Sequence, residues 1–284
     1  MIKWAAAFLV TWTSIASAAP SVKELTATLT AAGDEDSSKI QFGFDSTASH
    51  PSPTSWGEAD RDRRDLTRIT DPIIATSTDG TAVWAALLVR SAPQCAGLAG
   101  TLAQCDDPKQ PSLHVLLLLD RSAKTWSPIA VHSALPLTDK AITQLVADGV
   151  QLAPLPKQAS ADAAPAVAAF SQSLGDPKLL AASVSDRKDA VLFGSAPGER
   201  VVGGKAVAAQ LASWKLALTA RDGIAAGTSS SKNVAWVAAN VDARPFGKPD
   251  AKPASYRVLA LYERTGAAWK LVAIEFSYPT ARNE

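Results

Sequence analysis

The stretch WKLVAIEFSYP, residues 269–279, places apolar side chains in near alternation between a Trp and a Pro. The stretch WSPIAVHSALP, residues 126–136, has the same Trp-to-Pro spacing and a similar alternation. A period of two is typical of a strand, in which successive side chains point to opposite faces of a sheet. The two stretches therefore predict one kind of strand that occurs twice in the chain.

Similarity between the two halves continues upstream of these strands. When Trp126 is aligned with Trp269, the helix and strand patterns before them follow in the same order. Residues 82–89 (AVWAALLV) match residues 234–241 (VAWVAANV), and each segment carries a Trp at its third position. A repeated order of similar elements marks an internal repeat. The sequence therefore predicts two copies of one structural unit.

The second half predicts three helices followed by long strands. Pro165 stands near the start of the first helical pattern and Gly175 just past its end, which are positions these residues prefer. The helices are expected within residues 160–175, 175–185 and 203–218, and the strands within residues 223–228, 233–243, 255–264 and 267–278. Helices followed by antiparallel strands indicate an α+β fold, in which a curved sheet closes on the helices around a cone-shaped interior.

The first half has the pattern of a reduced copy. It offers one helix at residues 21–33 and, in place of the third helix, a charged run at residues 58–65. Such a run favours a solvated helix face, with a docking surface for a partner as the alternative. A Pro- and Ala-rich linker begins near residue 150. We therefore assign residues 19–149 to the first domain and residues 150–284 to the second.

The first residues have the pattern of a secretory signal peptide. An early Lys precedes an apolar run, and ASA at residues 16–18 forms a small-residue cleavage site. The run is too short and too polar to span a bilayer, and a retained anchor is the alternative. We expect residues 1–18 to be removed and the protein to be periplasmic or secreted, with no membrane span after cleavage.

The charge of the chain is almost balanced. It has 28 Lys and Arg residues against 27 Asp and Glu residues, which gives a formal net charge of +1. Nucleic-acid binding needs clustered positive charge, so the sequence predicts no such partner. Metal-ligand spacing, a nucleophilic triad and the phosphate-binding glycine patterns are also missing from the sequence. We therefore expect no metal and no cofactor.

Two cysteines, Cys95 and Cys105, lie close together in the first half. An even, close pair in an exported protein predicts a disulfide. Trp84 and Trp126 are 42 residues apart in the first half, whereas Trp236 and Trp269 are 33 residues apart in the second. The extra residues of the first half fall where the cysteines are. The disulfide is thus expected to staple an enlarged hairpin loop. A metal or redox pair is disfavoured, because the spacing is not CxxC and no His is near.

Three segments of the second half resemble a known family. Residues 193–218, 234–243 and 269–279 are similar to the nuclear transport factor 2-like superfamily, and within it to the SnoaL-like group. The resemblance covers residues 189–279, and over residues 39–136 it depends on the internal repeat. It implies two cone-shaped units, each a curved antiparallel sheet packed on N-terminal helices, the cystatin-like roll. It also implies varied roles, from isomerases, dehydratases and cyclases to non-catalytic binding modules, so the fold does not decide the function.

Two carboxylates are candidate catalytic bases. Glu275 shares a strand face with apolar residues, and a carboxylate in apolar surroundings can have a raised pKa and act as a base. Asp242 lies near a strand end, where it would suit proton abstraction beside a carbonyl if a tyrosine or tryptophan stabilised the oxyanion. The alternatives are a solvent-facing Glu275 and an Asp242 that closes a strand at the mouth of a hairpin.

A ligand pocket is expected inside the second cone. Its lining is predicted to use Phe193, Trp214, Trp236, Asn240 and Tyr256. Eight Trp and seven Phe residues are mostly expected in the core, and the pocket would take a few of them. His132, the first-half counterpart of Glu275, is expected to be structural.

These observations predict an exported, non-catalytic binding or scaffold protein that holds a small apolar ligand or a protein partner. The alternative is an isomerase-, cyclase- or dehydratase-type enzyme that works in the second domain only. The two halves are further expected to pair through their sheets as a pseudo-dimer, with a large apolar interface between them.

Overall fold

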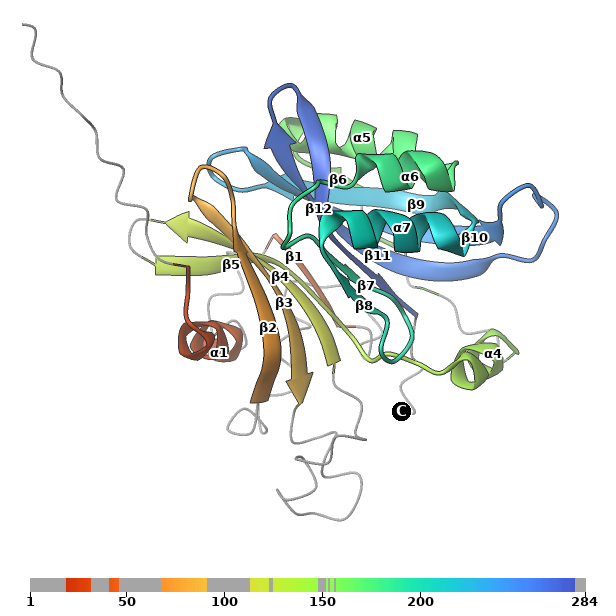
Figure 1. Cartoon of the computed structure of the whole chain (residues 1–284), viewed down its shortest axis with the longest axis horizontal. Coiled ribbons are helices and arrows are strands. Elements are labelled where there is room, and N and C mark those ends of the chain that lie inside the picture. Colours follow the sequence, from red (N-terminus) through yellow and green to blue (C-terminus); the bar gives the residue numbers. More distant parts are fainter. Residues whose placement is uncertain are drawn as a thin grey trace, which may run out of the picture.

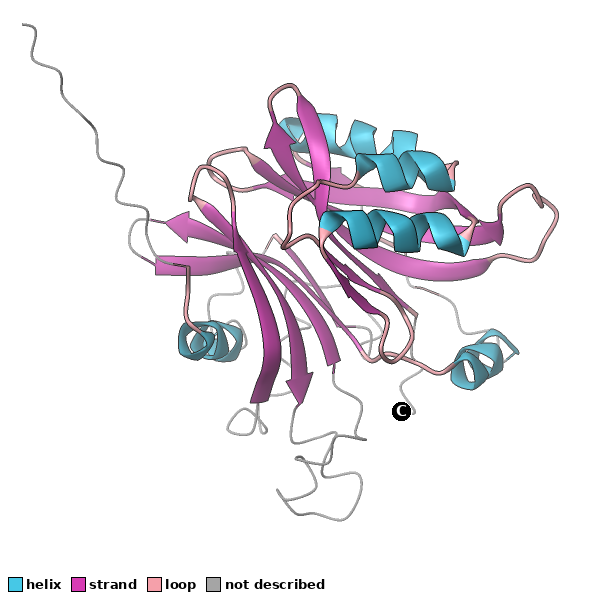
Figure 2. Ribbon diagram, viewed as in Figure 1, coloured by secondary structure: helices cyan, strands magenta, loops and turns pink. Residues whose placement is uncertain are grey.

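In the computed structural model, two curved sheets pack face to face, and three helices cover the outer face of the larger sheet (Figure 1, Figure 2). The structure describes residues 19–31, 41–45, 68–90, 113–122, 125–147, 152, 154–155 and 157–278. The predicted α+β class with curved antiparallel sheets is confirmed. The signal peptide at residues 1–18, the charged run at residues 58–65 and both cysteines lie outside the described residues.

The first sheet has five strands in the order β1-β5-β4-β3-β2. The strands are β1 (Phe42–Asp45), β2 (Arg68–Thr76), β3 (Ala82–Arg90), β4 (Leu113–Ser122) and β5 (Thr125–Ala134). Strand β1 is parallel to β5, and the other neighbours are antiparallel. Helix α1 (Val22–Ala31) lies beside this sheet and buries Leu25 against it. Ser21 and Glu24 form a capping box at its start, with Glu24 N to Ser21 Oγ at 3.3 Å and Ser21 N to Glu24 Oε2 at 2.6 Å.

The second sheet has seven strands in the order β6-β9-β10-β11-β12-β7-β8. The strands are β6 (Gln158–Ala159), β7 (Val191–Phe193), β8 (Arg200–Val202), β9 (Leu216–Thr228), β10 (Val234–Pro245), β11 (Ala254–Thr265) and β12 (Ala268–Ser277). Its helices are η4 (Ala161–Ala163), α5 (Ala164–Leu174), α6 (Pro177–Ser183) and α7 (Gly204–Trp214). Helix α4 (Asp139–Ala147) lies in the connection between the two sheets.

The helices begin where the sequence predicts and end for local reasons. Pro165 occupies the first turn of α5, and Asp176 caps α6 by accepting a 2.7 Å bond from Lys178 N. The predicted helix at residues 203–218 was too long, because Lys215 adopts a left-handed conformation (φ 51°) and ends α7. The chain then enters β9, which is also longer than the predicted strand at residues 223–228.

Both faces of the second sheet are buried. Ala235 and Val237 of β10 pack beneath the helices, whereas Trp236 and Ala238 face the first sheet. The layer between the sheets contains buried apolar residues from both, among them Trp84, Leu116 and Leu118 of the first sheet and Phe193, Leu259 and Leu261 of the second. A strand that is buried on both faces has a nearly continuous apolar sequence. Strands β10 and β11 have such sequences.

The two Trp-to-Pro stretches occupy equivalent strands. The first forms β5, which is antiparallel to β4 and parallel to the short β1. The second forms β12, which is antiparallel to β11 and parallel to the short β7. Each of these antiparallel pairs also contains one bulge, after the pair Leu118↔Ala130 in the first sheet and after Leu261↔Ala273 in the second. The strand order β1-β5-β4-β3-β2 is therefore repeated as β7-β12-β11-β10-β9.

Two hairpins exchange reciprocal contacts between the sheets. Thr78, in the β2–β3 turn, donates from its N–H and Oγ1 to Glu263 Oε1 at 2.6 and 2.8 Å. Ser230, in the β9–β10 turn, donates from its N–H and Oγ to Asp120 at 2.9 and 3.1 Å. The two acceptors are equivalent, since Asp120 pairs with the first residue of β3 and Glu263 with the first residue of β10. Each hairpin thus donates to a carboxylate on the other sheet.

Candidate functional site

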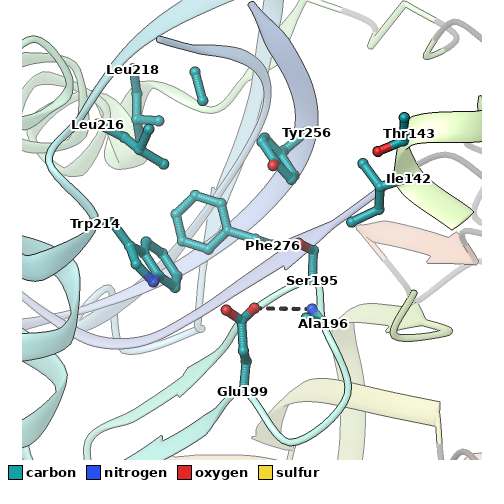
Figure 3. Close-up of a pocket in the computed structure, with 11 residues that line it drawn as sticks. Ile142, Thr143, Ser195, Ala196, Glu199, Trp214, Leu216, Leu218, Tyr256 and Phe276 are labelled. Atoms are coloured by element: carbon teal, nitrogen blue, oxygen red, sulfur yellow. Dashed lines mark hydrogen bonds between the residues drawn. The ribbon is translucent and has the colours of Figure 1, made fainter. Parts of the chain in front are cut away.

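A cleft of about 400 Å³ opens on the helix side of the second sheet (Figure 3). It lies where the end of α7, the strands β9 to β12, the β7–β8 hairpin and α4 come together. Its lining residues are Ile142, Thr143, Ser195, Ala196, Glu199, Trp214, Leu216, Leu218, Ala243, Tyr256 and Phe276. Most of these side chains are apolar, and the polar ones lie on the hairpin and on α4.

Three aromatic rings form one wall of the cleft. The indole of Trp214 meets the Phe276 ring edge to face, with centroids 5.3 Å apart, and Tyr256 meets the same ring at 6.3 Å. Tyr256 also packs edge to face on Tyr278 at 5.5 Å. Edge-to-face contacts are favoured by the ring quadrupoles, so each ring holds its neighbour in orientation. The wall is consequently a preformed aromatic surface.

The β7–β8 hairpin supplies the polar edge of the cleft. Glu199 accepts a 3.0 Å hydrogen bond on Oε2 from the backbone N–H of Ala196, and Gly194 N donates to the Glu199 carbonyl at 2.7 Å. A Cβ atom at Gly194 would collide with the Glu199 side chain, so only glycine leaves room for the carboxylate there. Gly198 makes the turn with a φ of 80°. The hairpin therefore holds Glu199 in a defined position.

Helix α4 closes the cleft from the side opposite the aromatic wall. Ile142 and Thr143 project from it toward Tyr256 (Figure 3). Thr138 caps the helix, accepting from Ala141 N on Oγ1 at 3.3 Å, and Leu137 N donates to the Ser195 carbonyl at 2.8 Å. The connection between the sheets is thereby tied to the hairpin that carries Glu199, and it contributes a wall that the sequence did not predict.

The predicted pocket residues divide between two places. Trp214 and Tyr256 line the cleft. Phe193 and Trp236 lie instead in the apolar layer between the sheets, where Phe193 stacks on His114 with centroids 4.4 Å apart. Trp236 donates from Nε1 to Gln41 Oε1 at 3.1 Å. Both residues point away from the helices, because they fall on the strand face opposite to the one that the helices cover.

Asn240 and Asp242 are also on the face of β10 that points away from the helices. Asn240 is fully buried, donates to Asp222 Oδ2 at 3.0 Å and accepts from Arg257 Nε at 2.8 Å. Asp242 accepts a 2.7 Å bond from Ser255 Oγ, on the paired strand. Neither is among the described residues that line the cleft. Burial lowers the pKa of Arg257 to about 9, and Asp222 opposes that shift in part.

Glu275 is fully buried between the two sheets, opposite His132. Its Oε2 lies 4.0 Å from His132 Nδ1, and His132 Nε2 is 2.9 Å from Ser277 Oγ. Burial raises the pKa of Glu275 well above its usual value, an effect that the Leu116 backbone opposes only in part. Burial, together with the positive charge of Arg257, lowers the pKa of His132 well below its usual value. Burial thus disfavours the charged form of both groups, and Glu275 is not among the described cleft-lining residues.

The described residues contain no group of three or more His, Cys, Asp and Glu side chains arranged to hold a metal ion. Within the same part of the chain, no helix has the length and hydropathy needed to cross a membrane.

Solved structures with related folds cover less than half of the chain. An NTF2-like protein of unknown function from Pseudomonas putida matches 43% of this chain and 90% of its own, with 16% identity and a TM-score of 0.34. A protein of Parabacteroides distasonis, provisionally described as a ketosteroid isomerase, matches 42% of this chain and 86% of its own, with 14% identity and the same TM-score. A domain with a cystatin-like fold from Nostoc punctiforme matches 43% and 81%, with 14% identity and a TM-score of 0.34. No family model matches the sequence, and no curated protein does.

Proposed function

We propose that the protein is a non-catalytic binding protein whose second unit holds a small, largely apolar ligand in the cleft. The main support for the proposal is the cleft of about 400 Å³, which has an aromatic wall of Trp214, Tyr256 and Phe276. Ligand sites are typically concave, mostly apolar and roughly 300–1,000 Å³ in volume, with a few polar groups that fix orientation. The cleft has this composition, with Thr143, Ser195 and Glu199 at its edge.

The positions of the acidic residues support binding over acid–base catalysis. General-base catalysis requires a base within hydrogen-bond reach of the substrate. Glu275 lies in the layer between the sheets, and Asp242 bonds to Ser255 on the face away from the helices. Glu199 is the one carboxylate among the described lining residues, and it is already bonded to the Ala196 N–H.

The two units are proposed to be SnoaL-like, nuclear transport factor 2-like copies that arose by tandem duplication and pair as a pseudo-dimer. The repeated strand order, the equivalent bulges and the reciprocal bonds of Thr78 and Ser230 support this history. In this proposal the first unit serves as a built-in partner that buries the back of the ligand-binding sheet. A protein partner at the cleft is the alternative occupant.

The test is a fluorescence titration of the full chain with N-phenyl-1-naphthylamine, an uncharged apolar probe. Leu216→Trp fills the cleft, whereas Thr219→Trp introduces the same side chain at an exposed position of the same strand. We expect the wild type and Thr219→Trp to bind the probe, and Leu216→Trp to bind it about tenfold more weakly or not at all, which is a loss of about 1.4 kcal/mol or more. Equal binding by Leu216→Trp and wild type, or no binding by either, would overturn the proposal.

A further inference from the structure

We propose that the cleft selects ligands that carry a positively charged nitrogen on an apolar or aromatic body, that is, small hydrophobic amines or quaternary ammonium compounds. The inference rests on the proposed function and specifies its ligand class. It follows from the combination of one oriented carboxylate with a wall of aromatic rings. Each part attracts a cation, and together they surround the same space (Figure 3).

The Glu199 carboxylate is oriented by its own hairpin. Its Oε2 receives the Ala196 N–H at 3.0 Å, and the side chain packs on the bare backbone of Gly194. An ionised carboxylate offers about four acceptor positions on two oxygens, so one backbone bond leaves most of its capacity for a ligand. In Figure 3 the carboxylate points from the hairpin toward the Trp214 and Phe276 rings.

The aromatic wall is suited to a cation in its own right. The face of an aromatic ring carries negative charge density and attracts an ammonium or guanidinium group within about 6 Å of the centroid, most strongly for Trp. The edge-to-face packing of Trp214 and Tyr256 on Phe276 keeps these rings in different orientations around the cleft. A ligand with a cationic head and an apolar body therefore meets favourable contacts at both ends.

Positive side chains do not compete for this carboxylate within the described lining. That lining contains no Lys, Arg or His. Arg200, the residue next to Glu199, turns toward the first unit, where its guanidinium bonds to the Asp71 carboxylate and, at 2.6 Å, to the Asp71 carbonyl. The charge of Glu199 is thus left facing the cleft, and an anionic ligand would be repelled by it.

The experiment compares two ligands of nearly equal shape in competition with N-phenyl-1-naphthylamine on the full chain. Benzyltrimethylammonium carries the charge, and neopentylbenzene is its uncharged carbon counterpart. Glu199→Gln keeps an oxygen for the Ala196 N–H but removes the charge. We expect this variant to weaken benzyltrimethylammonium about tenfold and to leave neopentylbenzene unchanged within about twofold. The ammonium affinity of the wild type should also fall as salt is added.

The outcomes separate this inference from the proposed function. If neopentylbenzene displaces the probe and benzyltrimethylammonium does not, or if Glu199→Gln affects both ligands equally, the cation preference is wrong and the apolar cleft stands. If neither ligand nor the probe binds, both proposals fail. Trp214→Leu is the second variant; it should weaken the ammonium compound more than the hydrocarbon, and Phe246→Ala, which truncates an exposed aromatic outside the cleft, should change neither.

Discussion

At the scale of single residues, the buried polar groups between the sheets are the most unusual feature of the molecule. His132 and Glu275 occupy corresponding strands, β5 and β12, and each pairs with a leucine of the neighbouring strand, Leu116 and Leu259. The Glu275 Oε2 and His132 Nδ1 atoms lie 4.0 Å apart. A His opposite a Glu avoids both a carboxylate pair and an imidazole pair in a fully buried site.

These two groups predict opposite dependences of stability on pH. The pKa of Glu275 is raised from 4.5 in the folded state. Its contribution to the free energy of unfolding is therefore present below pH 4.5 and is lost as the pH rises toward the folded pKa. The pKa of His132 is lowered from 6.5 in the folded state. Its contribution to the free energy of unfolding is therefore present above pH 6.5 and is lost as the pH falls toward the folded pKa. Between these two pH values the effects oppose each other.

Glu275→Gln should therefore make the free energy of unfolding less dependent on pH above pH 4.5. Gln is neutral at every pH, so the free energy of unfolding should fall less in the variant than in the wild type as the pH rises above 4.5. His132→Gln should act only on the acid side, below pH 6.5. Urea unfolding at pH values on both sides of 4.5 and 6.5 measures both, and a Glu275→Gln profile parallel to that of the wild type above pH 4.5 would show that burial does not raise the pKa of Glu275.

His114, like His132, should make the protein less stable as the pH falls below 6.5. It stacks on Phe193 and is almost fully buried, and burial lowers its pKa to about 4. A shift of this size corresponds to roughly 3 kcal/mol of stability, lost as the pH falls from 6.5 to about 4. His114→Phe keeps the ring contact without the titration. Thermal unfolding at pH 4.5 and pH 7 should show a smaller difference in Tm for this variant than for the wild type, and an equal difference would contradict the assignment.

At the scale of elements, the ends of helices and hairpins determine where the cleft lies. Helix α7 must stop at Trp214 for the indole to reach the cleft, and Lys215 stops it by adopting the left-handed conformation, with a φ of 51°. For a residue with a Cβ this conformation costs about 1 kcal/mol. Glycine is the residue that most often takes this position after a helix.

Lys215→Gly should accordingly stabilise the protein by about 0.5–1 kcal/mol without changing probe binding, since the gain in the fold exceeds the added freedom of the unfolded chain. Lys215→Ala removes the same side chain but keeps the Cβ, so it is the matched control and should not stabilise. Urea unfolding measures both variants. A Lys215→Gly variant that is no more stable than Lys215→Ala would contradict this account of the helix end.

Elements were easier to predict from the sequence than their relative placement. Pro165, Asp176 and the alternating strands are local signals, and the structure contains the helices and strands they predict. Alternation does not reveal which face of a strand meets the helices when both faces are buried, so Trp236 and Phe193 were expected in the pocket and lie between the sheets. Four cleft residues were missed for a different reason. No local sequence pattern links Trp214 to residues of distant elements, which here are Ile142, Thr143, Ser195 and Glu199.

At the scale of the whole molecule, Glu263 is the more buried of the two carboxylates that accept hairpin bonds from the other unit. It accepts from Thr78 at 2.6 and 2.8 Å and from Arg187 Nη1 at 3.0 Å, while Arg187 also donates to the Thr76 carbonyl at 2.9 Å. The guanidinium of Arg187 lies 4.6 Å above the Trp84 ring of the first sheet. The second unit thus holds the first through a buried, charged network.

Glu263→Gln should lower the free energy of unfolding by about 2 kcal/mol, because it weakens several hydrogen bonds to a buried charge. Asp120→Asn changes the acceptor of the other hairpin contact, which lies in a more exposed setting, and should cost less, about 1 kcal/mol. Denaturant unfolding of the full chain measures both. If the two substitutions cost the same, the reciprocal hairpin contacts contribute equally and the burial of Glu263 adds nothing.

The central claim is that the aromatic cleft of the second unit is the place where a ligand binds. A crystal structure of the full chain grown with N-phenyl-1-naphthylamine tests it most directly. A ligand-binding cleft should show density for the probe among Trp214, Tyr256 and Phe276, with the two sheets unchanged. Density for the probe only between the sheets or on the outer surface, with the cleft filled by solvent, would contradict the account.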